Sequence, residues 1–386
     1  MSLLPRLPTV VAGLGMFSLM PTPGAAYDLT EGFAINALLA GAGQCQDAAA
    51  RLPAENHDDG GRLDTFGNIC RGGMPVQFEL DFMPTENDEF FAKLGWAAGN
   101  GLNTASPFQL APWAADLEDD VQDINGRGRD YLLAAWYKHN FDLGGENSIG
   151  ATLGIIDTTA YLDGNAYAND EYTQFMNEAF VNAANYNLPS YDAGAALEAA
   201  FGRYSVSVVG MNVGENDDGN NYNFWGVQLG WHPSFSLGAG DYRFMVMGTS
   251  KAFLDPDGVN KENRLAYGLS FDQALGDVVG VFLRIVAQSD DAAISYRALY
   301  SGGIDIAGSA WGRAGDGVGV GYAHLAGGNV DVNQTNVFET YYRAQLNDHF
   351  ALTADVQYMS DSLEEADPRQ KDPSGWIFGL RAIAAF

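Results

Sequence analysis

The feature that most constrains the fold of this chain is an alternation of apolar and polar residues that recurs along most of its length. Clear examples are 76–82, 265–271 and 352–358, where every second residue is apolar and the residues between them are polar or small. A period of two is typical of a β-strand with one apolar face. No stretch after residue 26 is long and apolar enough for a transmembrane helix. The chain is therefore either a soluble β protein or a membrane β-barrel.

The alternating runs predict sixteen antiparallel strands, an even number that returns both chain ends to the same side of a barrel. The predicted strands are 29–42, 75–83, 88–98, 130–142, 148–157, 193–201, 203–213, 222–232, 241–251, 264–272, 278–288, 294–311, 317–326, 337–346, 350–360 and 375–386.

The connections between these strands differ in length on the two sides of the predicted barrel. Those at 43–74, 99–129 and 158–192 are long, whereas those at 84–87 and 143–147 are short. Long loops outside and short turns inside are typical of outer-membrane barrels. A soluble β-sandwich or β-helix would also alternate, but a sandwich has no need for many aromatic residues at strand ends. A β-helix would show a short repeat, and none is found.

Both ends of the sequence favour export to the bacterial outer membrane. Residues 1–26 resemble a signal peptide, with Arg6 before the apolar stretch 10–20 and small residues at 24–26. A single membrane helix is the alternative, but this stretch is too short for one. We therefore expect a barrel over residues 27–386. Its last strand ends on Phe386, an aromatic residue suited to the membrane interface.

Charge and motif content exclude several classes of function. The net charge of −29 argues against a nucleic-acid partner. The five histidines are scattered without metal-ligand spacing, and there is no G-x-S-x-G elbow or phosphate-binding loop. We expect no enzyme activity, metal or cofactor, although a membrane hydrolase stays open as an alternative. The G-x-G runs within 317–322 have the pattern of barrel wall.

The two cysteines, Cys45 and Cys70, fall in the first long predicted loop. An exported protein passes through an oxidising compartment, so an even count favours one disulfide between them. Two free thiols are the alternative. A bridge would restrain a long loop that has little core of its own.

Basic residues fall on the polar parity of their strands, which must face the lumen if the apolar parity faces lipid. This set comprises Lys93, Lys138, Arg243, Arg264, Arg284, Arg297, Arg343 and Arg381. The alternative is that they only balance inward acids such as Glu79, Asp272, Glu339 and Asp355. We expect five of these residues together to line a pore constriction, namely Arg243, Arg284, Arg297, Arg343 and Arg381.

The connection 158–192 is too aromatic to be a fully solvated loop, and it carries Asp163, Asp170 and Glu171. A loop of this length with its own apolar content is usually functional. We expect it to fold into the lumen, where its acids would face the arginines and set a transverse field. Candidate sugar contacts are Trp136, Tyr167 and Tyr341, because aromatic faces suit the C–H faces of sugars. Packing of the loop against the wall is the alternative role for such aromatics.

Several segments resemble the carbohydrate-selective porins of the OprB type. They are 129–141 (RDYLLAAWYKHNF), 148–157 (SIGATLGIID), 162–177 (LDGNAYANDEYTQFMN), 312–323 (GRAGDGVGVGYA), 337–361 (VFETYYRAQLNDHFALTADVQYMSD) and 372–386 (DPSGWIFGLRAIAAF). The stretch 312–323 has Ala314 where the family usually has Pro. The resemblance implies a sixteen-stranded barrel for sugar diffusion, with a homotrimer as one candidate assembly.

We therefore expect a passive outer-membrane channel for small polar solutes, with carbohydrates as the leading class. A general or anion-leaning porin that uses the arginines is the first alternative. A structural or adhesion barrel plugged by the loop 158–192 is the second. Channel conductance separates the porins from the plugged barrel, because a plugged barrel would carry no current.

Overall fold

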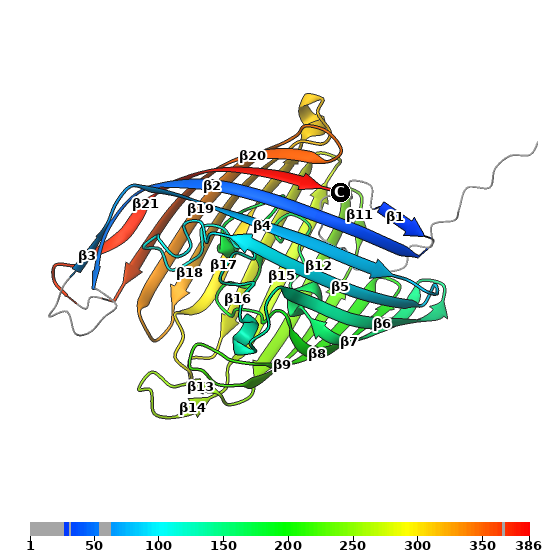
Figure 1. Ribbon diagram of the computed structural model, residues 1–386, viewed down its shortest axis with the longest axis horizontal. Coiled ribbons are helices and arrows are strands. Elements are labelled where there is room, and N and C mark those ends of the chain that lie inside the picture. The colour runs from blue at the N-terminus through cyan, green and yellow to red at the C-terminus, as the bar shows by residue number, and fades with distance from the viewer. Residues whose placement is uncertain (1–26, 31, 54–62, 365–366) are drawn as a thin grey trace, which may run out of the picture.

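A computed structural model describes residues 27–30, 32–53, 63–364 and 367–386 (Figure 1). The predicted signal peptide, residues 1–26, lies outside the described residues. Within the described ranges, no helix combines the length and the hydropathy needed to cross a bilayer.

The described chain forms a closed antiparallel barrel of sixteen strands, as the alternation predicts (Figure 1). The wall strands are β2 (Phe33–Pro53), β4 (Ile69–Phe82), β5 (Asp88–Ala98), β6 (Leu132–Gly144), β7 (Asn147–Ile156), β8 (Asp192–Phe201), β9 (Tyr204–Val213), β10 (Tyr222–Trp231), β12 (Gly238–Thr249), β15 (Leu265–Leu275), β16 (Val279–Gln288), β17 (Tyr296–Ala307), β18 (Gly317–Gly327), β19 (Val332–Gln345), β20 (Phe350–Leu363) and β21 (Lys371–Ala385). Pairing of β2 with β21, with Leu38 opposite Ala385, closes the barrel.

Short elements lie outside the sixteen wall strands, either at the rims of the barrel or within the two long loops that enter the lumen. They are β1 (Tyr27–Thr30), β3 (Leu63–Phe66), β11 (Ser234–Phe235), β13 (Phe253–Leu254), β14 (Lys261–Glu262), the helix α1 (Glu178–Val181) and 3₁₀ turns at 124–126, 158–160 and 308–311. The run predicted as one strand over 294–311 is β17 followed by the last of these 3₁₀ turns. The connections between wall strands are longer on one rim, the loop end, than on the other, the turn end.

The first hairpin differs from the sequence prediction. Much of the segment 43–74, predicted as a loop, belongs to β2 and β4, which extend the wall at the loop end. Small residues and glutamines continue the alternation there, so the strand pattern persists without large apolar side chains. Cys45 and Cys70 are therefore opposed residues of paired strands rather than loop residues. Their sulfur atoms form a disulfide, and the two residues sit on the outer surface.

The two faces of the wall have the composition expected for lipid outside and a polar interior. On β21, the side chains of Phe378 and Leu380 are 52% and 55% exposed on the outside of the barrel. The next residue along the strand, Arg381, is fully buried on the inside. Outward Trp, Tyr, Phe and Leu side chains repeat this pattern around the barrel. The parity argument thus orients most strands correctly from sequence alone.

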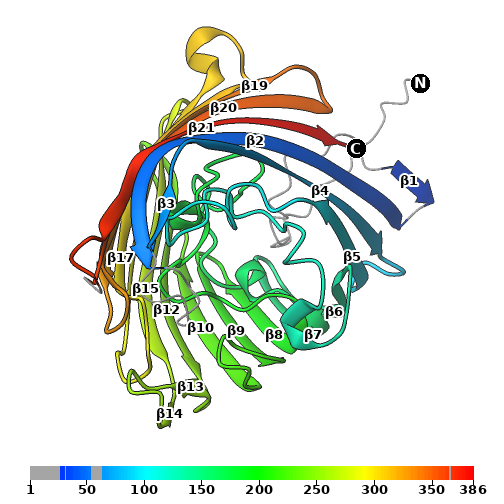
Figure 2. The same ribbon diagram turned by 60° about the vertical axis from the view of Figure 1, so that its left-hand side comes forward.

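The interior of the barrel is filled mainly by two long connections from the loop end. Figure 2 shows these segments, the cyan loop 99–131 and the green loop 157–191, inside the ring of strands. The longer loop brings Phe175 and Phe180 into contact at 4.7 Å between ring centroids. Gly321 of β18 admits this pair, because a Cβ there would lie 2.8 Å from Phe180 and 3.0 Å from Phe175. The glycine-rich run 317–322 is therefore wall that accommodates the loop.

Candidate functional site

Arg284 of β16 is the central anchor of the lumen loop 157–191. Its side chain and that of Asp163 are both fully buried, and they form an ion pair of 2.8 Å between Nε and Oδ1. The guanidinium also donates to the carbonyl oxygens of Phe180 (3.1 Å) and Ala168 (3.0 Å). A planar group with five donors can join separate parts of one loop in this way. The loop is thereby fastened to the wall over β16.

A second anchor joins the loop to β19 and β21. Arg381 is fully buried and donates to the carbonyl oxygens of Glu171 (2.6 Å) and Gln174 (2.9 Å). Glu339 of β19 accepts hydrogen bonds from the backbone N–H groups of Met176 and Asn177, at 2.5 and 3.0 Å. Charged wall residues therefore satisfy backbone groups of the loop that would otherwise be buried without partners.

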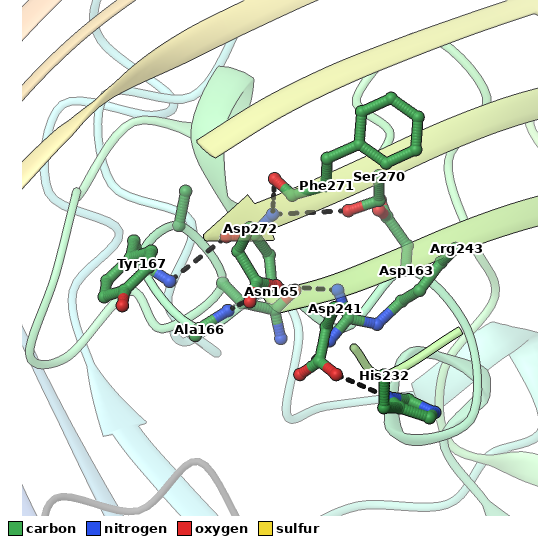
Figure 3. A network of polar contacts seen from close by, with 12 residues as sticks. Asp163, Asn165, Ala166, Tyr167, His232, Asp241, Arg243, Ser270, Phe271 and Asp272 are labelled. Carbon is green, nitrogen blue, oxygen red and sulfur yellow. Dashed lines mark hydrogen bonds and ion pairs between the residues drawn. The ribbon is translucent and has the colours of Figure 1, made fainter. Parts of the chain in front are cut away.

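The third anchor is the polar network of Figure 3, which lies on β12 and β15. Arg243 binds the carboxylates of Asp272 (2.7 Å) and Asp241 (3.1 Å). Asp272 in turn accepts a hydrogen bond from the backbone N–H of Ala166 at 3.2 Å. Asn165 donates to the carbonyl oxygen of Phe271 at 3.1 Å. The network holds the loop near its tip.

These contacts correct the predicted position of the arginines. We expected them to face the loop acids across an open gap, but Arg243, Arg284 and Arg381 are in direct contact with the loop or its carboxylate partners. Arg343 is only partly buried and binds Gln345 on its own strand. The strand pattern alone cannot distinguish a wall facing water from a wall covered by a loop, because both are polar.

Arg297 departs from the parity argument for a local reason. The β17–β18 register shifts between Tyr296 and Ala298, so Arg297 lies at a β-bulge. Its neighbour Tyr296 is the buried residue, with its hydroxyl 2.7 Å from that of Thr335. Arg297 itself is exposed. A bulge changes which residues share a face, and the sequence gives no signal for it here.

A cavity lies on the opposite side of the loop, against β2, β4, β5 and β6, and we call it the passage. Its volume is about 360 Å³, and it is lined by Asp170 and Glu171 of the loop but not by Asp163. Wall acids reach it from β4 and β5, and its one basic lining residue is Lys93. The charged lining residues are Glu79, Asp81, Glu89, Lys93, Asp157, Asp170 and Glu171.

The three predicted sugar contacts have different environments. Trp136 lines the passage and stacks on Phe91, with 4.9 Å between ring centroids and 19° between ring planes. Tyr167 is half-buried, and its ring occupies the space beside Gly280. Tyr341 is buried against Phe175 and donates to Asp305 at 3.0 Å. Only Trp136 of the three presents its ring to the passage, and Tyr341 serves the packing role.

The loop 99–131 contributes to the site, which sequence reasoning missed. Its Asp116 accepts hydrogen bonds of 2.8 Å from both Gln77 and Tyr191 and lies 3.8 Å from the ammonium of Lys93. Leu102, Trp113 and Leu117 of the same loop are completely buried. Apolar residues spaced through an otherwise acidic connection were the signal that could have revealed this packing.

A second cavity, of about 570 Å³, lies above the passage at the loop end, and we call it the vestibule. It shares Thr159, Val181, Asn182 and Tyr191 with the passage, so the two are adjoining. Its acidic lining residues are Asp116, Asp119, Asp120, Asp123, Glu178, Glu215 and Asp217. The one arginine, Arg264, is held over the rings of Tyr186 and Phe253, 5.0 and 5.4 Å from their centroids.

Asp120 is the vestibule acid with the clearest electrostatic perturbation. Burial, reinforced by the negative charge of Asp116, raises the pKa of Asp120 to about 7. A hydrogen bond of 2.9 Å from the backbone N–H of Leu117 acts in the opposite direction. This carboxyl group therefore changes charge near neutral pH. No group of three or more metal-ligating side chains that could hold an ion occurs in the described part of the chain.

Comparison with known proteins agrees with this architecture. The model of the carbohydrate-selective porin family, OprB, matches residues 99–382. An uncharacterized protein of Aquifex aeolicus is 28% identical over 295 residues, which cover 75% of this chain and 85% of the relative. Porin AaxA of Chlamydia abortus is 31% identical over 134 residues, covering 32% of this chain and 28% of that porin.

Solved structures share the fold at low sequence identity. OprB of Pseudomonas putida, in its high-pH structure, has a TM-score of 0.67 at 14% identity, with 93% of this chain and 95% of that chain covered. The outer-membrane channel DcaP of Acinetobacter baumannii has a TM-score of 0.56 at 10% identity, with 94% and 100% covered. The family match, the closed barrel and the loop-narrowed lumen identify this chain as a member of the OprB carbohydrate-selective porin family, a passive channel of the bacterial outer membrane.

Proposed function

We propose that this porin passes small carbohydrates through the passage between the lumen loop and strands β4–β6. The observation that carries the proposal is the stacked pair of Phe91 and Trp136 beside carboxylates in that passage. A sugar ring has an apolar C–H face that fits an aromatic ring and hydroxyl groups that fit carboxylate acceptors. The lining supplies both kinds of group at one level of the barrel.

The charge of the passage argues against the anion-leaning alternative. Six carboxylate side chains line it, together with the single ammonium group of Lys93. The arginines that would attract anions are engaged with the lumen loop or with neighbouring carboxylates. An acid-lined constriction repels anions and admits neutral or positively charged solutes. For assembly, a homotrimer is our proposal from the family resemblance alone, testable by native mass spectrometry.

The test is sugar flux into proteoliposomes together with conductance in planar bilayers. We expect conductance from the wild type, which would also exclude a plugged structural barrel. Trp136→Ala should slow glucose entry by about three- to tenfold. It removes the contact between the indole ring and the C–H face of the sugar, which contributes about 1 kcal/mol. Tyr341→Phe is the matched control, since its ring packs away from the passage. Equal glucose flux in both variants would contradict the proposal.

A hydrolase is the second candidate, because three side chains at the turn end lie in series like a catalytic triad. Nε2 of His232 is 2.8 Å from Oγ of Ser205, and its Nδ1 contacts Asp241. We favour the channel because Asp241 is shared with Arg243, and none of the three lines the passage or the vestibule. Labelling of Ser205 by a serine-directed fluorophosphonate would favour the hydrolase instead.

A further inference from the structure

Glu79 of β4 is a buried acid with no basic side chain within ion-pairing distance among the described residues. It is 8% exposed and lines the passage. Its carboxylate forms no hydrogen bond or ion pair with any residue in the described ranges. Burial of an ionised carboxylate without a partner is unfavourable, so such groups normally have a counter-charge nearby.

Lys93 is the basic residue whose charge reaches Glu79, but the two side chains do not form a direct ion pair. Lys93 is opposite Glu79 in the β4–β5 register. Its ammonium nevertheless pairs with Asp116 at 3.8 Å and lies 5.8 Å from the centroid of the Tyr191 ring. Asp116 belongs to the loop 99–131 and Tyr191 to the end of the lumen loop, so both draw the ammonium toward the vestibule. Glu79 is left facing the passage with Asp81 and Glu89 as its acidic neighbours on the lining.

Resting on the proposed function, we propose that the passage prefers sugars that carry an ammonium group. Glu79 supplies the counter-charge, and the Phe91–Trp136 pair supplies the face for the sugar ring. The adjoining vestibule has seven acidic lining residues and the single Arg264, so it concentrates cations before they enter. An ammonium group near an aromatic face also gains a cation–π attraction. A neutral sugar passes by the same route with the aromatic contact and hydroxyl hydrogen bonds but without the ion pair.

The experiment compares glucosamine with glucose, two sugars of nearly the same size, in proteoliposomes at pH 6, where the amine is protonated. We expect glucosamine to enter faster than glucose through the wild type. Glu79→Gln should lower this ratio by about fivefold, the upper range for an ion pair in a partly solvated site. Glucose flux should change much less than glucosamine flux, because the amide oxygen that replaces the carboxylate still accepts hydrogen bonds from sugar hydroxyl groups, and heat-resistant barrel assembly should be retained. The matched control is Glu262→Gln, whose carboxylate pairs with Lys251 on the rim.

The outcomes separate this inference from the proposed function. Glucose entry without a glucosamine preference, or a preference that survives Glu79→Gln, would overturn the inference and leave the sugar channel intact. No entry of either sugar through a conducting wild-type channel would overturn the proposed function itself. If both Glu79→Gln and Glu262→Gln lose the glucosamine preference, the preference depends on the overall charge of the protein. That result would also overturn the role of Glu79.

Discussion

The two sides of this lumen use charge in opposite ways. On the side of β12, β16 and β21, Arg243, Arg284 and Arg381 are matched by carboxylates and loop carbonyl oxygens. On the side of β4 and β5, Glu79 and its acidic neighbours face an open passage with Lys93 as the one basic residue. The first side fixes the loop, and the second is the side that we propose meets the solute. Polar residues on the inside of a barrel therefore belong to two classes that only their partners distinguish.

The difference also bears on ion preference, which we propose is set by the open side rather than by the arginines. An arginine bound to a buried carboxylate contributes little field in the passage, because the pair is close to neutral. Acids outnumber basic residues on the linings of the passage and the vestibule, so we expect a solute to meet a net negative charge there. The comparison predicts that changes on the anchored side alter loop position and stability, whereas changes on the open side alter selectivity.

The largest expected effect comes from breaking the anchored side with Arg284→Met. It leaves Asp163 buried without its counter-ion, which costs about 3–5 kcal/mol. We expect the loop to detach, with higher and noisier single-channel conductance and proteolytic cleavage within 157–191. Arg203→Met, at an exposed turn, is the control. Adding Asp163→Leu to the variant should restore part of the lost stability, and a double variant no better than the single one would contradict the anchor assignment.

On the open side, a disulfide bond between β2 and β4 restrains the wall. Cys45 and Cys70 are predicted to be linked in the exported protein, and non-reducing mass spectrometry of outer membranes should find their peptides joined. Replacing both with serine should lower the unfolding free energy by about 3 kcal/mol, because the bridge closes a separation of 25 residues. Heat-dependent mobility on gels measures this change. Free, alkylatable thiols in native membranes would contradict the prediction.

The smallest effect concerns pH and Asp120 in the vestibule. Its pKa of about 7 means that the carboxyl loses its proton as the pH rises from 6 to 8. The vestibule then becomes more negative, so cation preference, read from the reversal potential in a salt gradient, should increase slightly over this range. Asp120→Asn should reduce that increase. Because the folded pKa is raised, this group also lowers the unfolding free energy as the pH rises from about 4 to about 7. An unchanged pH profile in Asp120→Asn would assign the titration to another group.

Sequence patterns predicted much of the wall of this protein. Period-two alternation identified sixteen strands and placed Arg284 and Arg381 inside, since a strand between lipid and water must segregate its two faces. The aromatic content of 158–192 likewise indicated a loop folded into the lumen. The prediction was wrong at the ends of β2 and β4, which continue through small residues beyond the last large apolar side chains. It was also wrong at Arg297, where a β-bulge shifts the alternation between inward and outward side chains.

The alternation by itself determined the closed barrel, because it acts locally on every strand. Only the tertiary structure decided which part of the interior stays open. That choice depends on contacts between residues far apart in the sequence, such as Asp163 with Arg284 and Asp116 with Lys93. An inward arginine and an inward glutamate occupy equivalent polar positions in the alternating pattern of a strand. Whether each is buried under a loop or faces a solute depends on the path of loops 99–131 and 157–191 through the lumen, and periodicity carries no information on that path.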